Sequence, residues 1–155
     1  MMAGLTSRGL SMLSFLEDSE HSIEDIDVKQ RWSGQSKFGK HDFITILKGQ
    51  LDEYFRGERQ IFSLPLDLYG TEFQCNVWRA LLKIPYGVCC SYQEQAKRLG
   101  KPKAIRAVAN ANRQNRIAII VPCHRVIGKN GELTGYRAGL WRKQQLIALE
   151  RNVQK

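Results

Sequence analysis

The sequence predicts an α+β protein, within the broad α/β class, made of a small N-terminal unit and a mainly helical C-terminal unit. Apolar and polar side chains first alternate on both sides of the turn-like residues 6–9, which predicts a β-hairpin. From Asp42 the apolar positions recur with the period of a helix. Two signatures of helix N-termini follow in the second half of the chain. These patterns divide the chain into domains at residues 1–65 and residues 66–155.

The N-terminal domain should contain the hairpin and one helix. Leu10, Met12 and Leu16 are expected on the buried face of the hairpin, because side chains alternate along a strand. Residues 17–40 are polar and predict a loop or a short irregular helix. The helix that begins at residue 42 should end near Gly57.

Two helices of the C-terminal domain begin at capping boxes, in which a Ser or Thr is followed three residues later by Glu or Gln. Thr71 pairs with Gln74 in the first, and Ser91 pairs with Glu94 in the second. The second of these helices should be short, because Gly100 ends it.

A third helix is expected from about Pro102 to Asn112, with Pro102 at its first position. Its side chains are small or basic, as are those beside it: Lys103, Ala104, Arg106, Ala107, Ala109, Ala111 and Arg113. Two short helices with a tight turn between them, the second one basic, predict a winged helix-turn-helix-like domain. Small side chains allow close approach to a nucleic acid, and Lys and Arg contact its phosphates. Tight packing of an alanine-rich helix is the alternative.

Positive charge is concentrated in the second half of the chain. Residues 1–78 hold 8 Lys and Arg against 12 Asp and Glu, a balance of −4. Residues 79–155 hold 16 Lys and Arg against 3 Asp and Glu, a balance of +13. Such asymmetry favours a nucleic acid as partner. The alternative is a generally basic surface.

A Cys-His pair follows an apolar run in the C-terminal domain. Residues 119–121 predict a strand that ends before Pro122, since Pro restricts the residue before it. Cys123 would then lie at the mouth of a strand, where His124 or Arg125 could favour its nucleophilic thiolate. The alternative is that Cys123 is a small buried hydrophobe and His124 a core histidine.

The last helix is predicted from Leu140 to Glu150, with Leu140, Trp141, Leu146, Ile147 and Leu149 as its apolar residues. Glu150 lies near the end where the helix dipole disfavours negative charge. It should therefore have a cationic or N–H partner, although a plain surface Glu remains the alternative. Glycines bracket residues 134–139, which allows this loop to lie close to a ligand.

Several classes of function are disfavoured by composition. No run approaches the roughly 18 apolar residues of a membrane helix, and the N-terminus does not resemble a signal peptide. We therefore expect a cytoplasmic protein (nuclear in a eukaryote), with its four cysteines reduced. The four Cys and three His lack the paired spacing of a zinc site, so no metal is expected.

The sequence resembles the O6-alkylguanine-DNA alkyltransferases, also called methylated-DNA–protein-cysteine methyltransferases. The match runs from about Leu64 to Glu150 and weakens before residue 41. It rests on Gly70-Thr71-x-Phe73-Gln74-x-x-Val77-Trp78, Ile84-Pro85-Tyr86-Gly87, Ser91-Tyr92, Arg106-Ala107-Val108-Ala109, Asn115, Pro122-Cys123-His124-Arg125-Val126, Gly128-x-x-Gly131 and Gly135-Tyr136-Arg137-x-Gly139.

This resemblance implies a DNA repair protein that flips O6-alkylguanine, and in some cases O4-alkylthymine, out of duplex DNA. Such a protein transfers the alkyl group irreversibly to its own cysteine, once per molecule. The resemblance also implies minor-groove binding, no cofactor, no membrane, no obligate protein partner and a monomer. Relatives begin with one more β-strand, so the N-terminal domain is expected to be shortened.

The resemblance assigns roles to individual residues. Cys123 would be the nucleophile, His124 a base acting through a water molecule, and Glu150 the group that orients His124. Asn115 would link the basic helix to the active-site segment, and Tyr92 would donate toward N3 of the leaving guanine. Arg106 would fill the gap left by the flipped base. Further DNA contacts are implied for Lys103, Ala107, Ala109, Arg113 and Tyr92, and contacts to the base for Tyr92, Val126, Tyr136 and Arg137.

Three other functions are compatible with parts of the pattern. A non-catalytic lesion-binding relative would lack the reactive cysteine, whereas Cys123 is in place. A transcription regulator would need a sensor domain, for which 155 residues leave little room. A cysteine hydrolase built on Cys123 and His124 would leave the basic half of the chain without a purpose.

Overall fold

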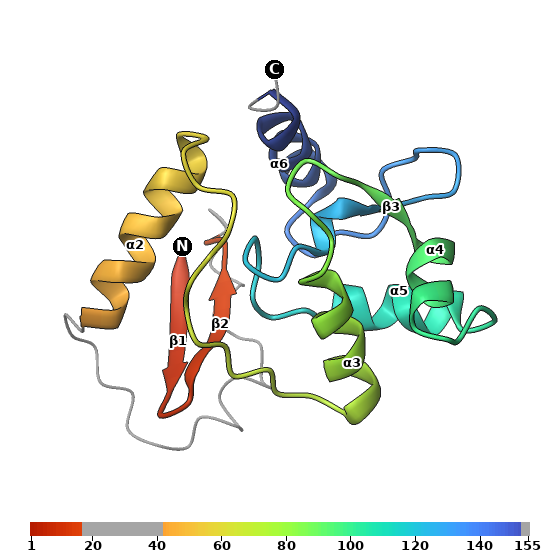
Figure 1. Ribbon diagram of the computed structural model, residues 1–155, viewed down its shortest axis with the longest axis horizontal. Coiled ribbons are helices and arrows are strands. Elements are labelled where there is room, and N and C mark those ends of the chain that lie inside the picture. The colour runs from red at the N-terminus through yellow and green to blue at the C-terminus, as the bar shows by residue number, and fades with distance from the viewer. Residues whose placement is uncertain (17–41, 153–155) are drawn as a thin grey trace.

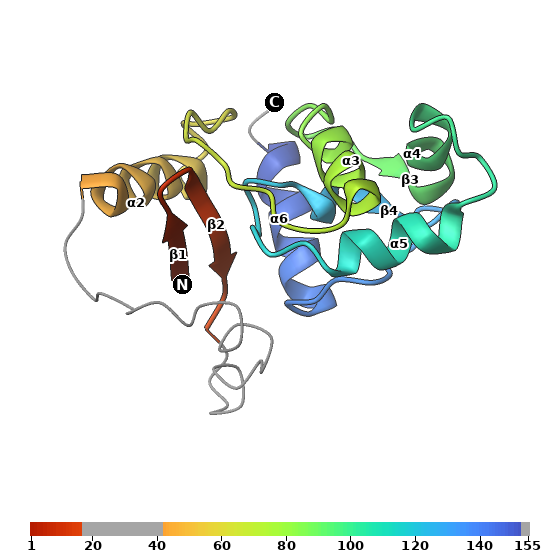
Figure 2. The ribbon, with the colours of Figure 1, turned by 90° about the horizontal axis from the view of Figure 1, so that it is seen from below.

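The computed structural model describes residues 1–16 and 42–152 and has the predicted α+β architecture. The N-terminal part contains β1 (Met2–Thr6), β2 (Gly9–Ser14) and α2 (Asp42–Phe55). The C-terminal part contains α3 (Glu72–Leu81), β3 (Cys90–Ser91), α4 (Tyr92–Arg98), α5 (Ile105–Arg113), the 3-10 helix η1 (Cys123–Arg125), β4 (Val126–Ile127) and α6 (Leu140–Asn152). The hairpin and α2 lie on one side of α6, and α3, α4 and α5 lie on the other (Figures 1 and 2). The loop predicted at residues 17–40 lies outside the described residues.

The hairpin and the burial of Leu10 are confirmed, but the prediction that Met12 and Leu16 share its buried face is wrong. Leu10 and Leu13 are buried, whereas Met12 is half-buried and Leu16 is 52% exposed. Gly4 pairs with Met12 and Leu5 pairs with Leu10, so Ser11 is an extra residue that forms a bulge. A bulge interrupts the alternation of side chains. This lets two residues three positions apart face the same core.

β2 also joins the N-terminal hairpin to the C-terminal part. The amide of Leu13 donates to the carbonyl of Arg116, and the amide of Ala118 donates to the carbonyl of Leu13, both at 2.8 Å. Gly9 lies against the segment that contains Pro65, where a Cβ atom would come within 2.3 Å of the Pro65 carbonyl oxygen. Gly9 has a φ of +139°, which also favours glycine. The hairpin is thus hydrogen-bonded to the chain that leads to Cys123.

α2 begins and ends close to the predicted residues. Leu47, Gln50, Leu51 and Tyr54 form its buried face, at the spacing of one side of a helix. Gly57 follows with a φ of +77°, as expected where a helix terminates. Tyr54 has no exposed surface, which places a phenol from the N-terminal part inside the core.

Both capping boxes are confirmed. The Thr71 hydroxyl accepts from the Gln74 amide at the start of α3, and the Ser91 hydroxyl accepts from the Glu94 amide at the start of α4. A buried pair of side-chain amides then joins α4 to α5. Gln95 donates to Asn112 at 3.2 Å, and Asn112 donates back at 2.7 Å.

α5 begins at Ile105, so the prediction that Pro102 starts this helix is wrong. The amide of Ala104 donates to the carbonyl of Lys101 at 2.9 Å, which makes Pro102 the second residue of a four-residue turn. The fixed φ of proline suits that position as well as it suits a first helical residue. Pro102 is thus compatible both with the start of a helix and with a turn. Because it lies in a turn, the segment between α4 and α5 is longer than predicted.

The predicted strand at residues 119–121 is absent, because tight turns replace it. Ile119 has a φ of +68°, and the Ile120 amide donates to the Ala118 carbonyl at 2.7 Å, which closes a three-residue turn around it. Pro122 is the centre of a second such turn, closed by a 2.9 Å bond from the Cys123 amide to the Val121 carbonyl. The run resembles a strand because its side chains are apolar and buried. Cys123 consequently begins a 3-10 helix.

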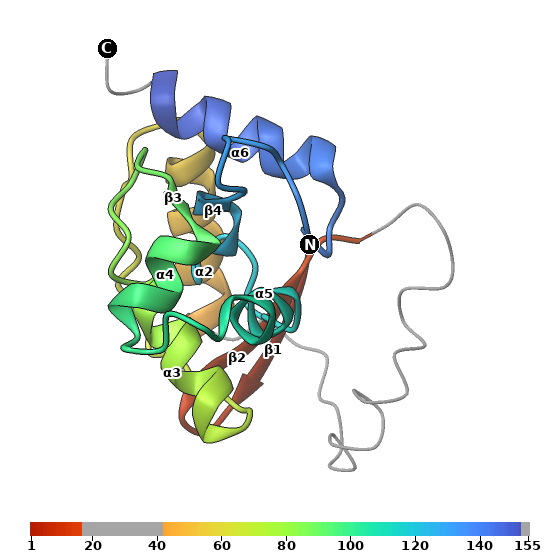
Figure 3. The same cartoon turned by 90° about the vertical axis from the view of Figure 1, so that its right-hand side faces the viewer.

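The short strands β3 and β4 run parallel, with Cys90 opposite Val126 and Ser91 opposite Ile127. This pairing brings Tyr92, the first residue of α4, toward the segment that carries Cys123. A 3.1 Å bond from the Gly131 amide to the Gly128 carbonyl closes a turn at residues 128–131. In Figure 3, α6 lies on one side of the β3–β4 pair, and α3 and α5 lie on the other.

Candidate active site

Cys123 is 9% exposed and begins η1. Its Sγ accepts a hydrogen bond from the Asn115 side-chain amide at 3.2 Å. Burial raises the pKa of this thiol, while the Asn115 hydrogen bond and the positive charge of Lys143 act in the opposite direction. Because burial is the larger effect, Cys123 is mainly a thiol at neutral pH. It needs a base before it can act as a nucleophile.

Asn115 connects the end of α5 to the Cys123 segment. Its Nδ2 donates to the carbonyl of Val121 at 2.8 Å and to the carbonyl of Ile117 at 3.3 Å, besides its contact with Cys123. Its Oδ1 accepts from the amide of Ile117 at 3.0 Å. The buried amide side chain thus spans the turns that precede Cys123, where the link between helix and active site was predicted.

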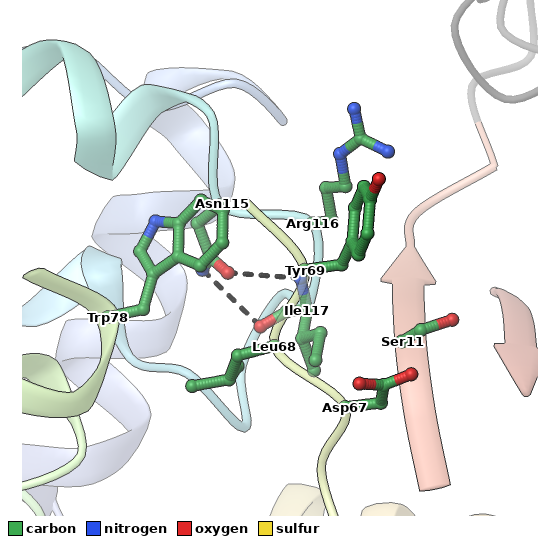
Figure 4. A pocket seen from close by; sticks show the side chains of 8 residues that line it. All are labelled: Ser11, Asp67, Leu68, Tyr69, Trp78, Asn115, Arg116 and Ile117. Carbon is green, nitrogen blue, oxygen red and sulfur yellow. Dashed lines mark hydrogen bonds between the residues drawn. The ribbon is translucent and has the colours of Figure 1, made fainter. Parts of the chain in front are cut away.

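A small pocket that opens to solvent lies beside this amide (Figure 4). It is lined by Ser11, Asp67, Leu68, Tyr69, Trp78, Asn115, Arg116 and Ile117. Figure 4 shows β2 on one side of these residues and Trp78 on the other. Cys123 and His124 are not part of the lining. The pocket therefore lies at the junction of the two parts of the chain and does not include Cys123.

His124 is fully buried, and its Nε2 lies 2.7 Å from Oε1 of Glu150. Burial lowers the pKa of His124, and its contact with Glu150 only partly opposes this shift. The imidazole is then neutral, with its proton on Nε2, where the carboxylate accepts it. Nδ1 has no hydrogen-bond partner among the described residues. A neutral imidazole in this tautomer presents Nδ1 as a proton acceptor.

Glu150 is 1% exposed and accepts five hydrogen bonds. Its Oε1 accepts from Tyr54 Oη at 2.8 Å, from His124 Nε2 and from Arg125 Nη2 at 3.0 Å. Its Oε2 accepts from the Gly87 amide at 3.0 Å and from Arg125 Nε at 2.9 Å. Burial raises the pKa of this carboxyl, but hydrogen bonds from His124 and Arg125 outweigh it and lower the pKa to about 2. The prediction that Glu150 has cationic and N–H partners is confirmed.

Arg125 is a member of the site whose place the sequence did not reveal. Its guanidinium forms a two-point ion pair with Glu150, and its Nη1 donates to the Ile84 carbonyl at 2.6 Å. The ring of Tyr86 lies 5.7 Å from the guanidinium. A buried carboxylate requires such compensation, so Arg125 is what keeps Glu150 ionised without solvent. The sequence suggested Arg125 as a neighbour that could favour the Cys123 thiolate, whereas the structure pairs its guanidinium with Glu150.

Lys143 is the second unforeseen residue. It is fully buried, and its Nζ donates to the carbonyls of Val126 at 2.6 Å and Thr134 at 2.7 Å. Burial lowers its pKa to about 8, although the nearby Cys123 opposes this shift. A spacing signal did exist, since Lys143 and Glu150 flank Leu146 and Ile147 on one helical face.

The predicted apolar face of the last helix needs correction for that reason. Leu140 is 46% exposed and Trp141 is 61% exposed, while Lys143 occupies the buried position. Hydrophobicity alone predicted that Leu140 and Trp141 are buried. Lys143 is buried instead, because two backbone carbonyls accept hydrogen bonds from its ammonium group.

Tyr92 and the loop at residues 134–139 contact each other. Tyr92 Oη donates to the Thr134 carbonyl at 3.1 Å, and burial raises the pKa of this phenol. Gly135 has a φ of +57°, and a Cβ atom there would lie 3.2 Å from Tyr92 Oη. Tyr136 is half-buried, its Oη has no hydrogen-bond partner among the described residues, and Arg137 is exposed. The loop therefore lies against the phenol of Tyr92.

α5 has one buried and one solvent-facing side. Val108, Ala111 and Asn112 are buried, and Trp78 Nε1 donates to the Ala111 carbonyl at 2.8 Å. Most of the residues predicted to contact DNA are on the solvent-facing side of α5 or just before it. Lys103, Arg106, Ala107 and Arg113 are exposed, and Ala109 is half-buried. α5 thus presents small and basic side chains to solvent.

Within the described ranges, no group of His, Cys, Asp and Glu is arranged to hold a metal ion. None of the described helices has the length and apolar character that a membrane span requires.

Comparison with known proteins gives a consistent result along the whole chain. The family described as 6-O-methylguanine DNA methyltransferase matches through its DNA binding domain at residues 72–152 and its ribonuclease-like domain at residues 6–68. A methylated-DNA–protein-cysteine methyltransferase of Methanosarcina barkeri is 44% identical over 152 residues, which are 98% of this chain and 90% of that protein. One from Mycolicibacterium paratuberculosis is 61% identical over 102 residues, which are 66% of this chain and 62% of that protein. The crystal structure of Mycobacterium tuberculosis OGT in complex with DNA has a TM-score of 0.81 and 42% identity, and the match covers 97% of this chain and 86% of that one.

Proposed function

This chain belongs to the 6-O-methylguanine DNA methyltransferase family, and from this we propose that it transfers the O6-alkyl group of guanine in DNA to its own Cys123. Its activity is that of a methylated-DNA–protein-cysteine methyltransferase, and DNA is its binding partner. The observation that supports the choice of residue best is the buried Cys123 next to a neutral His124, which Glu150 holds by a 2.7 Å bond.

The reaction is a displacement at the alkyl carbon. His124 Nδ1 accepts the Cys123 proton through a water molecule, and Glu150 stabilises the imidazolium that forms. The Cys123 sulfur forms a bond to the alkyl carbon while the bond from that carbon to O6 breaks. The electron pair of the broken bond passes into the guanine ring. The Tyr92 hydroxyl turns from the Thr134 carbonyl and donates toward N3 as the charge develops there. The thioether product is stable, so each protein molecule reacts once.

The positive charge of Lys143 supports thiolate formation at Cys123. Its carbonyl partners, Val126 and Thr134, hold the ammonium in a fixed place inside the protein. An ammonium group held near a developing thiolate lowers the free energy of the thiolate. The Val126 carbonyl has a second lone pair with which it can still meet a base, as the resemblance implies.

Duplex DNA would be bound through the minor groove by the outer side of α5. Arg106 and Arg113 would approach the strands, and the small Ala107 and Ala109 would allow close contact. We also propose that residues 1–65 and 66–155 are separate domains, that the protein acts as a cytoplasmic (or nuclear) monomer, and that Tyr136 and Arg137 border the flipped base.

Mass spectrometry of the intact protein tests the proposal. After mixing with a duplex that contains O6-methylguanine, the protein should gain one methyl group, and peptide mapping should place it on Cys123. Saturation at one methyl per protein is expected. DNA binding without any gain in mass would instead support a lesion-binding protein that performs no repair.

Arg106→Ala should slow repair in duplex DNA by roughly tenfold or more and leave the reaction with a free O6-alkylguanine base nearly unchanged. Only the duplex reaction requires a base to leave the stack, which costs a few kcal/mol. Single-turnover rates on both substrates measure this. Arg56→Ala is the matched control, since Arg56 is an exposed arginine of the N-terminal part, paired with Glu58. Equal losses on the two substrates would contradict the role of Arg106.

A further inference from the structure

The phenol of Tyr54 reaches the active site from the N-terminal part of the chain. Tyr54 lies in the last turn of α2, has no exposed surface, and donates to Oε1 of Glu150 at 2.8 Å. Its ring meets the ring of Tyr86 edge-on, with centroids 6.0 Å apart. Burial raises the pKa of Tyr54, and the charge of Glu150 adds to this, so the phenol stays protonated and can only donate. One hydrogen bond thus connects α2 to α6 inside the core.

The same carboxylate oxygen serves His124. Oε1 of Glu150 accepts from Tyr54, His124 and Arg125 within 3.0 Å. Each donor withdraws part of the negative charge that the oxygen offers to the other two. Without the phenol, Oε1 would attract the His124 proton more strongly and would favour the imidazolium. The carboxylate would also lose one of the contacts that hold it in position.

We propose that Tyr54 is a positioning residue for the transfer reaction, because its hydroxyl holds Glu150 and limits its charge so that His124 remains a neutral base. The inference rests on the proposed role of Cys123 as acceptor. It gives the N-terminal part an effect on the chemistry through the hydrogen bond from Tyr54 to Glu150.

The charged groups around His124 come from several elements. Arg125 of η1 and Lys143 of α6 disfavour the imidazolium, and Glu150 of α6 favours it. Cys123 precedes His124 in η1, and Tyr86 lies between α3 and β3 against Arg125. Tyr54 is neutral and acts on His124 only through Glu150. Removing its hydroxyl therefore changes the balance between His124 and Glu150 without deleting a charge.

Tyr54→Phe removes the hydroxyl and keeps the ring. Single-turnover methyl transfer from an O6-methylguanine duplex should be measured between about pH 5 and pH 9, the range in which a histidine titrates. At neutral pH the rate constant should fall roughly ten- to a hundredfold, because Glu150 is less firmly positioned and therefore orients His124 less well. The acidic limb of the profile should move to higher pH by about one unit, because His124 becomes easier to protonate.

Tyr69→Phe is the matched control, since Tyr69 also carries a phenol but is 56% exposed, and the hydrogen bonds of Glu150 come from other groups. It should retain the wild-type profile. Thermal unfolding of each variant sets an assay temperature at which all are folded. An unchanged rate overturns the inference, and so does a slower rate with an unmoved acidic limb, which would mark a merely structural tyrosine. If the wild-type protein itself transfers no methyl group, the proposed function fails instead.

Discussion

Cys123→Ser should abolish alkyl transfer while DNA binding persists. Serine is nearly isosteric with cysteine, but its hydroxyl is far less acidic than a thiol and cannot form the nucleophilic thiolate. Loss of a catalytic nucleophile costs on the order of 10⁶-fold in other enzymes, so no methylated protein should be detected. The basic outer side of α5 is unchanged by this substitution. Affinity for an O6-methylguanine duplex, measured by fluorescence anisotropy at fixed salt, should stay within about threefold of wild type.

Cys75→Ser is the control for this variant. Cys75 is also buried, and its Sγ lies 3.5 Å from the Leu68 carbonyl, a contact that a serine hydroxyl can keep. It should transfer methyl groups at the wild-type rate. If Cys123→Ser protein still gained a methyl group, another of the chain's four cysteines would be the acceptor.

Glu150→Gln should give the largest loss of stability, about 3–5 kcal/mol at neutral pH. The guanidinium of Arg125 would stay buried opposite a neutral amide, whose NH₂ group would also face donors. The transfer rate should fall on the order of 10³- to 10⁴-fold, because the tautomer of His124 is no longer fixed. Urea unfolding and single-turnover transfer measure the two effects. Glu72→Gln, at an exposed glutamate in the first turn of α3, should change stability by less than about 1 kcal/mol.

The pH dependence of this loss follows from the lowered pKa of Glu150. A carboxyl whose pKa drops to about 2 on folding contributes stability above its unfolded pKa and loses it as the pH falls through its folded pKa. A shift from 4.5 to about 2 corresponds to about 3 kcal/mol. The stability difference between wild type and Glu150→Gln should therefore shrink between about pH 4.5 and pH 2. A difference that is constant with pH would mean that Glu150 is not ionised in the folded protein.

Local hydrogen bonding was what the sequence predicted best. The capping boxes at Thr71 and Ser91 place donor and acceptor three residues apart, so the chain encodes them without reference to other elements. Those local signals and the basic helix were enough to predict the fold class, and the residue pattern singled out Cys123, His124 and Glu150. The roles of the other site residues came from the family resemblance. The charge of Glu150 at a helix end also predicted that it has partners.

Only the tertiary structure decided which residues are the partners of Glu150. Tyr54 and Glu150 are 96 residues apart in sequence, and no local pattern relates them. Lys143 was missed because burial of a lysine depends on two carbonyls that other segments supply. Two tight turns stand where a strand was predicted at residues 119–121, and the buried amide of Asn115 bonds the Val121 carbonyl, which a strand partner would otherwise take. Sequence determines which groups are chemically able to react or pair, whereas the free energy of burying charged and polar groups decides which of them meet.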